Sequence, residues 1–364
     1  MSISVETKQS TLEALRSSEG YFHRVQRLTP TRFWINNPTR EEVEWAIAAG
    51  AISCTCNPSY SMKMIQGESQ AYVLAVIDRV IREVPDDQEA ADLIQQKLIN
   101  EILEGFLPLY REHPGVQGFV SIQGNPLLDD DPHAIVEEAL RYSKLGENFI
   151  AKIPATEAGL QAMESLISEG VPIIATEIMG VPQLVHTCEL YARISRASGK
   201  FPPFYLTHIT GIFDNHIKEA AKHSGVNISS DYLWQAGSIV ARRQYEIWEE
   251  RDYPGIILGG GARGLQHFTE FVGSKMHITI NWNGTASELI AQNPPVVDRM
   301  KTIPTQHVVE ELLEKIPDFA KAYLEDGLSV KEFKEFGPVQ RFRESFIRGW
   351  TFLLSTIRYR RTLV

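Results

Sequence analysis

The amino-acid sequence predicts an α/β fold, a closed (β/α)8 barrel with additional N- and C-terminal helices. Short apolar, β-rich segments recur along the 364 residues, each bounded by Pro, Gly or Asn, and segments with helical periodicity lie between them. Such short runs are typical of strands that a parallel sheet buries on both faces. No G-x-G-x-x-G fingerprint follows the first run, which favours the barrel over an open doubly wound sheet.

The apolar runs predict eight strands, and the segments between them predict helices. The strands are expected at residues 32–36, 51–56, 118–123, 148–154, 172–178, 204–209, 255–259 and 277–281. Helices are expected at residues 40–49, 132–143, 158–169 and 185–197. Thr39 and Glu42 form a capping-box pattern at the start of the first of these helices, and Gly170 is a stop signal for the third.

Two further helical regions extend the barrel. Residues 61–110 read as helical throughout, and we expect them to cover one mouth of the barrel. From Pro304 to the end the pattern is again helical, with Trp350, Phe352 and Leu353 as core anchors. The predicted organisation is an N-terminal helical extension over residues 1–30, a barrel catalytic domain over 31–300, and C-terminal helices packed on the barrel over 301–364.

Composition and charge argue against several classes of protein. The formal net charge of −10, with no basic stripe, argues against a nucleic-acid partner. No run approaches 18 uninterrupted apolar residues and the N-terminus lacks an apolar signal segment, so neither a membrane span nor secretion is expected. The three cysteines do not form a disulfide framework, which favours the cytoplasm, and Cys54 and Cys56 are read as buried strand residues rather than metal ligands. No metal site is predicted.

The candidate functional residues are those at the carboxyl ends of the predicted strands, where barrel enzymes carry their active sites. In strand order these positions offer Asn36, then Asn57 and Ser59, then Gln123, Lys152, Thr176, then Thr207 and His208, and finally Gly261 and Arg263 in the run 259–264.

Lys152 carries the strongest chemical signal. It lies in the apolar run 149–154, where burial disfavours the ammonium form and lowers the pKa from about 10.4. A neutral lysine amine is a nucleophile toward carbonyl carbon. The alternative is a lysine at a strand edge that extends its charged end into water.

The glycine-rich run 259–264 is the second signal. After a seventh barrel strand, exposed backbone N–H groups form a phosphate cradle, and Arg263 can supply a fixed positive charge. The alternative is a flexible turn without a ligand.

Taken together, these residues resemble the transaldolase family from about Trp34 to Leu289. The segment 55–59, Thr-Cys-Asn-Pro-Ser, is similar to the family's T-x-N-P-S motif, and residues 150–160 are similar to its lysine signature I-K-I-P-A-T-x-x-G. Thr176 stands where the family has a threonine on strand five, and residues 259–264 resemble its G-A-S-x-R phosphate loop. The resemblance implies a cofactor-free enzyme in which Lys152 forms a Schiff base with a phosphorylated ketose.

The sequence departs from the family pattern at both acid/base carboxylates. Asn36 stands where the family has aspartate on strand one, and Gln123 where it has glutamate on strand three. Ile212 falls on the phosphate-binding arginine after strand six. An amide cannot accept a proton at neutral pH, so we consider His208 and Glu177 as replacement proton-transfer groups. Because strand side chains alternate, Thr176 and Glu177 should not both face the barrel interior, and neither should Thr207 and His208 unless a bulge intervenes.

Three functions remain open from the sequence. The leading hypothesis is a Schiff-base enzyme on a ketose phosphate, with sedoheptulose 7-phosphate favoured, diverged toward dehydration, phosphate elimination and intramolecular aldol cyclisation to a seven-carbon cyclitol. The alternatives are a true transaldolase that transfers dihydroxyacetone, and a non-catalytic sugar-phosphate-binding protein. A homodimer is the default expectation from symmetry statistics.

Overall fold

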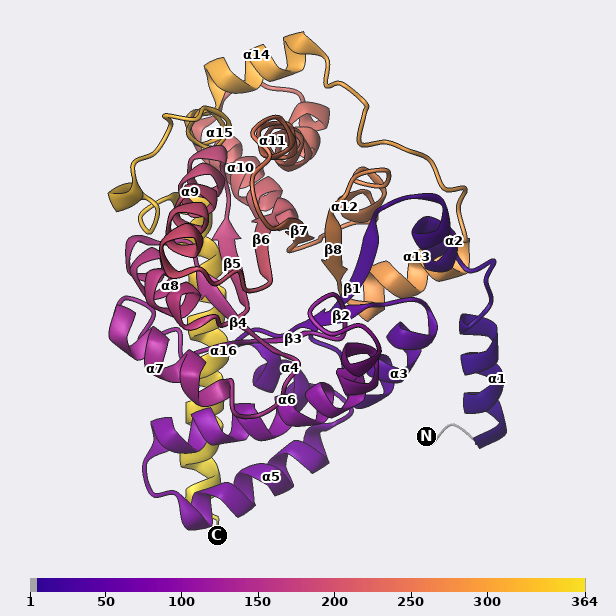
Figure 1. Cartoon of the computed structure of the whole chain (residues 1–364), viewed down its shortest axis with the longest axis vertical. Coiled ribbons are helices and arrows are strands. Elements are labelled where there is room, and N and C mark those ends of the chain that lie inside the picture. The colour runs from indigo at the N-terminus through magenta and orange to yellow at the C-terminus, as the bar shows by residue number, and fades with distance from the viewer. Residues whose placement is uncertain (1–4, 364) are drawn as a thin grey trace.

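Eight parallel strands close into a barrel in chain order, as the computed structural model of residues 5–363 shows (Figure 1). The first and eighth strands pair with each other and complete the ring. The strands are β1 (Arg32–Asn36), β2 (Ser53–Thr55), β3 (Val120–Gln123), β4 (Phe149–Pro154), β5 (Ile173–Ile178), β6 (Phe204–Ile209), β7 (Ile256–Gly260) and β8 (His277–Ile280). The predicted (β/α)8 fold is therefore confirmed.

Helices surround the barrel and extend it at both ends. They are α1 (Val5–Leu15), α2 (Tyr21–Leu28), α3 (Arg40–Ala48), α4 (Tyr60–Gln66), α5 (Gln70–Glu83), α6 (Asp87–Glu112), α7 (Pro132–Tyr142), α8 (Glu157–Glu169), α9 (Val181–Ser198), α10 (Thr210–Ser224), α11 (Ser230–Glu250), α12 (Gln266–Thr269), α13 (Ser287–Gln292), α14 (Gln306–Lys315), α15 (Pro317–Tyr323) and α16 (Gly337–Arg361). Short turns of helix lie at Trp282–Ala286 and Val330–Glu332. The helical region expected at 61–110 is three helices rather than one, and only α4, the first of them, contributes to the mouth of the barrel.

The capping box predicted at the start of α3 is present. The Thr39 hydroxyl accepts a hydrogen bond from the Glu42 N–H at 3.2 Å, and the Glu42 carboxylate accepts one from the Thr39 N–H at 2.8 Å. Each side chain thus accepts a hydrogen bond from a backbone N–H that has no partner within the helix.

A layer of aromatic and aliphatic side chains fills the interior of the barrel. Trp34 of β1 and Tyr205 of β6 come from distant strands and meet with their ring centroids 5.0 Å apart. The indole N–H of Trp34 donates to Nδ1 of His277 at 3.0 Å, so this buried polar group is satisfied. The other buried members of the layer are Ile52, Phe119, Ile150, Ile174 and Leu258.

The position of this layer determines which side chains point inward at the carboxyl ends of the strands. Successive strand residues point to opposite faces, so a residue two positions after an interior residue is also interior. Asn36 follows Trp34 at this spacing, Lys152 follows Ile150, and Thr207 follows Tyr205. The apolar layer therefore forms the floor of a polar site at the carboxyl ends of the strands.

Helix α16 crosses that end of the barrel and is the long yellow helix in Figure 1. It packs against α4, α5, α6 and α10. Trp350 is fully buried at its centre and donates its indole N–H to the Gln88 side chain of α6 at 3.0 Å. Arg361 and Arg343, near its two ends, pair with Asp87 at 2.9 Å and with Asp129 at 2.8 Å. The helix is thus anchored on both sides of the barrel mouth.

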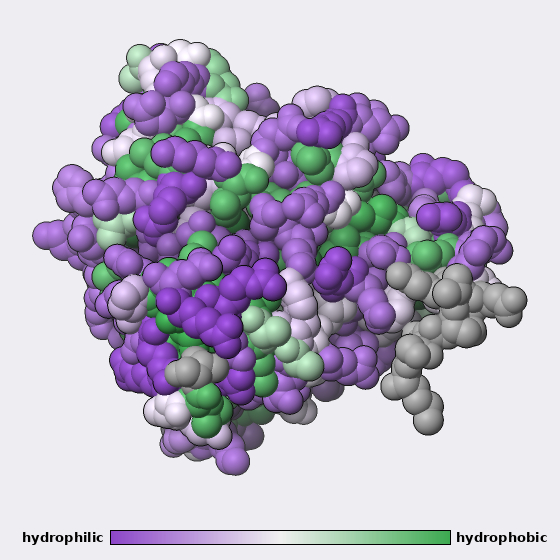
Figure 2. All heavy atoms as spheres, turned by 90° about the horizontal axis from the view of Figure 1, so that it is seen from below, coloured by the Kyte–Doolittle hydropathy of each residue, from purple (hydrophilic) through white to green (hydrophobic). Residues whose placement is uncertain are grey.

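The outer surface is mostly polar. Figure 2 shows hydrophilic side chains over most of the visible face, with apolar ones in small separate groups. Isolated exposed apolar residues are ordinary on soluble domains and do not by themselves mark an interface. None of the helices described is both long and apolar enough to cross a membrane. The homodimer stays a prediction.

We predict that the anchoring of α16 contributes strongly to stability. Replacing Trp350 with alanine removes a fully buried ring and should cost about 3–5 kcal/mol in the free energy of unfolding. Chemical denaturation followed by circular dichroism measures this loss. The neighbouring exposed substitution Thr351→Ala is the control and should change the midpoint little. Equal midpoints for the two variants would contradict the anchoring role.

Candidate active site

A cavity of about 580 Å³ opens at the carboxyl ends of the strands. Its walls come from strand ends on one side and from α4 and α16 on the other. The lining includes Asn36, Asn57, Ser59, Lys152, Thr207, Gly261 and Arg263 among the residues singled out from the sequence. Seven positions from five different strands and βα connections therefore converge on one space, as expected for a barrel enzyme.

Lys152 is buried at the floor of this cavity. Its side chain is 6% exposed, with the apolar strand β4 around it and the Phe346 ring of α16 centred 5.6 Å from Nζ. Burial lowers the pKa of Lys152 to about 8, while the carboxylate of Glu177 acts in the opposite direction. A useful fraction of the amine is therefore neutral near neutral pH and available for attack on a carbonyl carbon.

Glu177 lies beside Lys152 because β5 contains a bulge. In the pairing of β5 with β6, Ala175 faces Leu206 but Ile178 faces His208, so β5 has one extra residue between these pairs. Glu177 has φ of +62°, in the left-handed region that a residue with a side chain rarely adopts. The Glu177 carboxylate nevertheless accepts a hydrogen bond from Gln123 of β3 at 3.2 Å, so the expected alternation of Thr176 and Glu177 does not hold at this bulge.

The carboxyl group of Glu177 is held close to its neutral form. Burial raises the pKa of Glu177 to about 8, and the charge of Asp129 acts in the same direction. Lys152, the Gln123 hydrogen bond and Arg343 lower the pKa in part. Oε1 accepts from the Gln123 Nε2 at 3.2 Å, whereas Oε2 has no partner among the described residues. A protonated carboxyl with a free oxygen next to an amine is suited to donate or accept a proton there.

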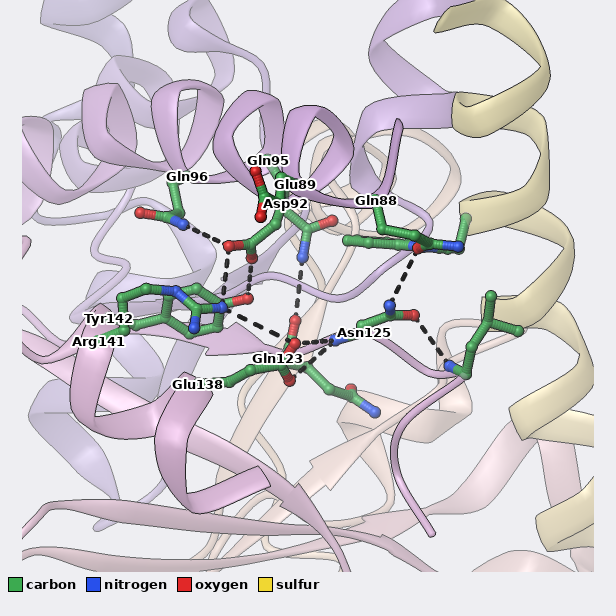
Figure 3. Close-up of polar contacts among 12 residues, drawn as sticks. Gln88, Glu89, Asp92, Gln95, Gln96, Gln123, Asn125, Glu138, Arg141 and Tyr142 are labelled. Atoms are coloured by element: carbon green, nitrogen blue, oxygen red, sulfur yellow. Dashed lines mark hydrogen bonds and ion pairs between the residues drawn. The ribbon is translucent and has the colours of Figure 1, made fainter. Parts of the chain in front are cut away.

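Gln123 is fixed next to Lys152 by the pairing of β3 with β4, where the two residues are direct partners. Figure 3 shows the contacts around the end of β3, where the Gln95 side chain of α6 donates to the Gln123 carbonyl at 3.0 Å. The Asn125 N–H donates to Glu138 of α7 at 3.1 Å. Gly124 makes this possible, because a Cβ there would lie 1.9 Å from a Glu138 carboxylate oxygen. The amide of Gln123 is thus a rigid bridge to Glu177 rather than a mobile group of the open cavity.

Asn36 belongs to a hydrogen-bonded group on the opposite wall. Its Nδ2 donates to the Asn281 side chain at 2.8 Å and its Oδ1 accepts from the Thr55 hydroxyl at 2.9 Å. Thr55 also contacts the Thr279 hydroxyl at 2.7 Å. No group in this set accepts a proton at neutral pH, so the wall can orient hydroxyl groups but cannot act as a base.

Thr176 and Thr207 present hydroxyl groups without a partner among the described residues. Thr207 lines the cavity directly, whereas Thr176 is buried beside Glu177 and does not reach the open space. A buried hydroxyl without a partner is costly, so a ligand or ordered water is the natural partner for both groups.

Asn57 and Ser59 line the cavity but also hold its wall together. The Asn57 Oδ1 accepts from the Ser59 N–H at 3.0 Å, which shapes the turn into α4. The Ser59 hydroxyl donates to the Ser345 carbonyl of α16 at 3.1 Å. Gly349 permits this contact, because a Cβ there would come within 2.7 Å of the Ser59 backbone.

The glycine-rich loop, residues 259–264, contributes Gly261 and Arg263 to the cavity. Gly261 has φ of +65°, which glycine adopts without strain. The Arg263 guanidinium donates to the Ala262 carbonyl at 2.9 Å, and burial lowers its pKa from the ordinary arginine value. The group keeps its charge because an arginine pKa remains far above neutrality.

His208 was expected to bind substrate, but it does not line the cavity. Its ring points outward from β6 and Nε2 contacts the Gly237 carbonyl of α11 at 3.2 Å. Burial lowers the pKa of His208 to about 4, so the ring is neutral at physiological pH. No bulge interrupts the pairing of β6 with β7, so Thr207 takes the inward position and His208 the outward one.

Two cations in the cavity were not identified from the sequence. Lys63 of α4 and Arg348 of α16 join Lys152 and Arg263, and the lining contains no carboxylate. Lys63 lies four residues after Ser59 and could have been inferred from helical spacing, whereas Arg348 comes from a distant helix. In a chain of net charge −10, such a cavity favours an anionic ligand.

The described residues contain no group of three or more His, Cys, Asp or Glu side chains suited to a metal ion. Cys54 and Cys56 are buried with their sulfur atoms 3.9 Å apart.

Comparison of the sequence with known proteins agrees with a barrel that carries a buried amine at the end of its fourth strand. The sequence profile described as "Transaldolase/Fructose-6-phosphate aldolase" matches residues 33–335, so this chain belongs to that family. A protein named "Transaldolase" from Trichodesmium erythraeum is 28% identical over 207 residues, which cover 52% of this chain and 54% of the relative. A "Transaldolase" from Neisseria meningitidis serogroup C is 24% identical over 239 residues, 60% of this chain and 64% of the relative. "Transaldolase 2" from Nostoc punctiforme is 30% identical over 168 residues, 44% of each chain. The matches thus span between 44% and 64% of the length of these relatives.

We predict that the reactivity of Lys152 follows its lowered pKa and depends on Glu177. The rate of its modification by a small amine-directed reagent should rise with pH through a midpoint near 8. Glu177 ionises over the same pH range, because its pKa is raised to about 8, and its negative charge then favours the ammonium. Glu177→Gln removes this charge, so the pKa of Lys152 falls and the midpoint moves to lower pH. Peptide mass spectrometry across pH 6–10 measures this rate.

The exposed substitution Glu157→Gln on α8 is the matched control and should leave the midpoint in place. The same midpoint in Glu177→Gln and the unsubstituted protein would show that the two groups are not coupled.

Proposed function

We propose that this chain is a Schiff-base enzyme that acts on a phosphorylated ketose. The observation that carries the proposal is the cavity itself, in which a buried amine of lowered pKa shares one space with three further cations and no carboxylate. The amine of Lys152 adds to the C2 carbonyl and water leaves, which gives an iminium. The cations hold the phosphate, and the volume of about 580 Å³ accommodates a six- or seven-carbon sugar phosphate such as sedoheptulose 7-phosphate.

The position of the acid/base groups favours dehydration over carbon–carbon cleavage. The iminium makes the C3 proton acidic, and Glu177 in its ionised form takes this proton to give an enamine. The enamine electrons then expel the C4 hydroxyl, which takes a proton from Glu177 and leaves as water. Cleavage of C3–C4 needs a base at the C4 hydroxyl, where the wall of Asn36, Thr55 and Asn281 offers only amides and hydroxyls.

Phosphate release and ring closure are not part of this proposal, although the sequence suggested them. In sedoheptulose 7-phosphate the C7 phosphate is remote from C2, and an iminium at C2 does not activate C6 or C7. Both steps require a carbonyl next to C6, which Lys152 alone does not generate. A cyclitol product is therefore an outcome to be tested rather than inferred.

A second candidate is dihydroxyacetone transfer between sugar phosphates. The relatives are named transaldolases, which favours it, and so does the segment 55–59, which resembles the T-x-N-P-S motif of the family. In this reading Glu177 replaces both missing carboxylates.

Borohydride trapping distinguishes these reactions. The protein is incubated with fructose 6-phosphate or sedoheptulose 7-phosphate, reduced, digested and mapped by mass spectrometry, with free phosphate assayed in parallel. We expect a full-length or dehydrated adduct on Lys152 and no adduct in Lys152→Met. A three-carbon adduct would instead establish cleavage, and phosphate release would revive the cyclisation hypothesis. The absence of any Lys152 adduct with either sugar would reject the Schiff-base proposal and favour a binding protein.

A second prediction concerns the wall of amides. Asn36→Asp places a base where C3–C4 cleavage requires one, so the rate of three-carbon adduct formation should rise by about 10²-fold. The adjacent substitution Asn37→Asp adds the same charge to the same cavity at another position and should not raise cleavage. An equal rise in both variants would mean that the added charge, and not its position, is responsible.

A further inference from the structure

The backbone of Arg263 is held from behind by a buried histidine. The Arg263 N–H donates to Nδ1 of His267 at 2.8 Å. Because Nδ1 accepts, the ring carries its hydrogen on Nε2, which donates to Oδ2 of Asp214 on α10 at 2.8 Å. Both side chains are only 2% exposed, so water does not compete for these hydrogen bonds.

The hydrogen-bonded chain continues into the body of the barrel. Oδ1 of Asp214 accepts from the Gly237 N–H of α11 at 2.7 Å, and the Gly237 carbonyl receives His208 of β6 at 3.2 Å. Gly237 has to be a glycine for this contact, since a Cβ there would lie 2.7 Å from Oδ1 of Asp214. His208, which does not reach the cavity, thus belongs to the support of the glycine-rich loop.

The loop is also packed directly against the first turn of α10, which follows β6. A Cβ at Gly211 would lie 2.6 Å from the Gly261 carbonyl and 2.8 Å from the Arg263 nitrogen. Ile212 packs against Gly261 at the position where the family pattern has an arginine. Arg263 is consequently the one charged side chain of residues 259–264, and its placement depends on the support behind it.

We propose that His267 and Asp214 are positioning residues that set the glycine-rich loop for a phosphate group, which rests on the proposed action on a ketose phosphate. Neither side chain lines the cavity, so they act through Arg263 rather than on the ligand. Because the Arg263 N–H donates to His267, it is not available to bind phosphate, and the hydrogen bond fixes the orientation of the Arg263 backbone. The ligand chemistry is a phosphate dianion, whether carried by a sugar or free in solution.

Asp214→Asn tests this arrangement because, whichever way the amide and the imidazole are turned, two N–H donors then face each other. If the amide oxygen faces Gly237, the new NH2 faces the Nε2 hydrogen of His267. If the ring instead moves its hydrogen to Nδ1, that hydrogen faces the Arg263 N–H. If the amide turns over, its NH2 faces the Gly237 N–H. One buried hydrogen bond is lost in each case, so phosphate binding should weaken by roughly tenfold or more.

The measurement compares ligands with and without phosphate. For Asp214→Asn we expect the half-saturating concentration of fructose 6-phosphate in Lys152 trapping to rise by roughly tenfold, while that of unphosphorylated fructose changes little. The stabilisation of the thermal midpoint by inorganic phosphate should fall in parallel. His267→Gln, which keeps an acceptor and a donor, should restore behaviour close to that of the unsubstituted protein, whereas His267→Leu should not.

The chain offers a matched control in a second histidine–aspartate pair. His216 and Asp318 lie 2.7 Å apart away from the cavity, and Asp318→Asn should alter neither ligand. Equal weakening of both sugars in Asp214→Asn, or no change in either, would overturn the proposal. If no sugar is trapped by the unsubstituted protein, the proposed function fails. The effect of inorganic phosphate on the thermal midpoint then tests the role of the loop independently. Failure of the unsubstituted protein to respond to phosphate would then overturn the loop inference. Should Asp214→Asn not fold, the two His267 variants provide the same comparison.

Discussion

The burial of one primary amine is the constraint on which the rest of the site depends. Lys152 occupies a dry position between the aromatic floor of the barrel and the Phe346 ring of α16. An ammonium at such a position is poorly solvated, which lowers its pKa and makes the amine nucleophilic. The closed barrel, the filled interior and the helix across the mouth all serve to keep water away from this one group while a ligand can still enter.

Positive and negative groups lie on different sides of the Lys152 amine. The charged side chains that line the cavity are all cations, and the nearby carboxylates are either paired or held neutral. Asp129 is occupied by Arg343, and Glu42 by Lys63 at the rim. Glu177 alone remains close to Lys152, and its raised pKa keeps it mostly protonated at neutral pH. Anion binding and proton transfer are thereby assigned to different sides of the same amine, so neither interferes with the other.

The sequence was sufficient to predict the barrel and most of the polar residues that lie above its apolar layer. Short apolar runs located all eight strands, and the period of two placed Asn36, Lys152 and Thr207 inside once the strands were known. The same rule holds at Thr207 and His208 but fails at Thr176 and Glu177, because a bulge and a left-handed residue cannot be read from alternation. The contributions of Phe346 and Arg348 depend on tertiary packing across almost 200 residues, which no local pattern contains.

The bulge in β5 shows how an active site of this kind can change its chemistry without changing its scaffold. One additional residue between two strand partners rotates a side chain from the outer face to the inner face. A barrel can in this way gain an ionisable group in its interior, and here the amide of Gln123 orients that group. A local shift of backbone register is therefore enough to change which ionisable group lies beside a nucleophile, while the nucleophile keeps its place.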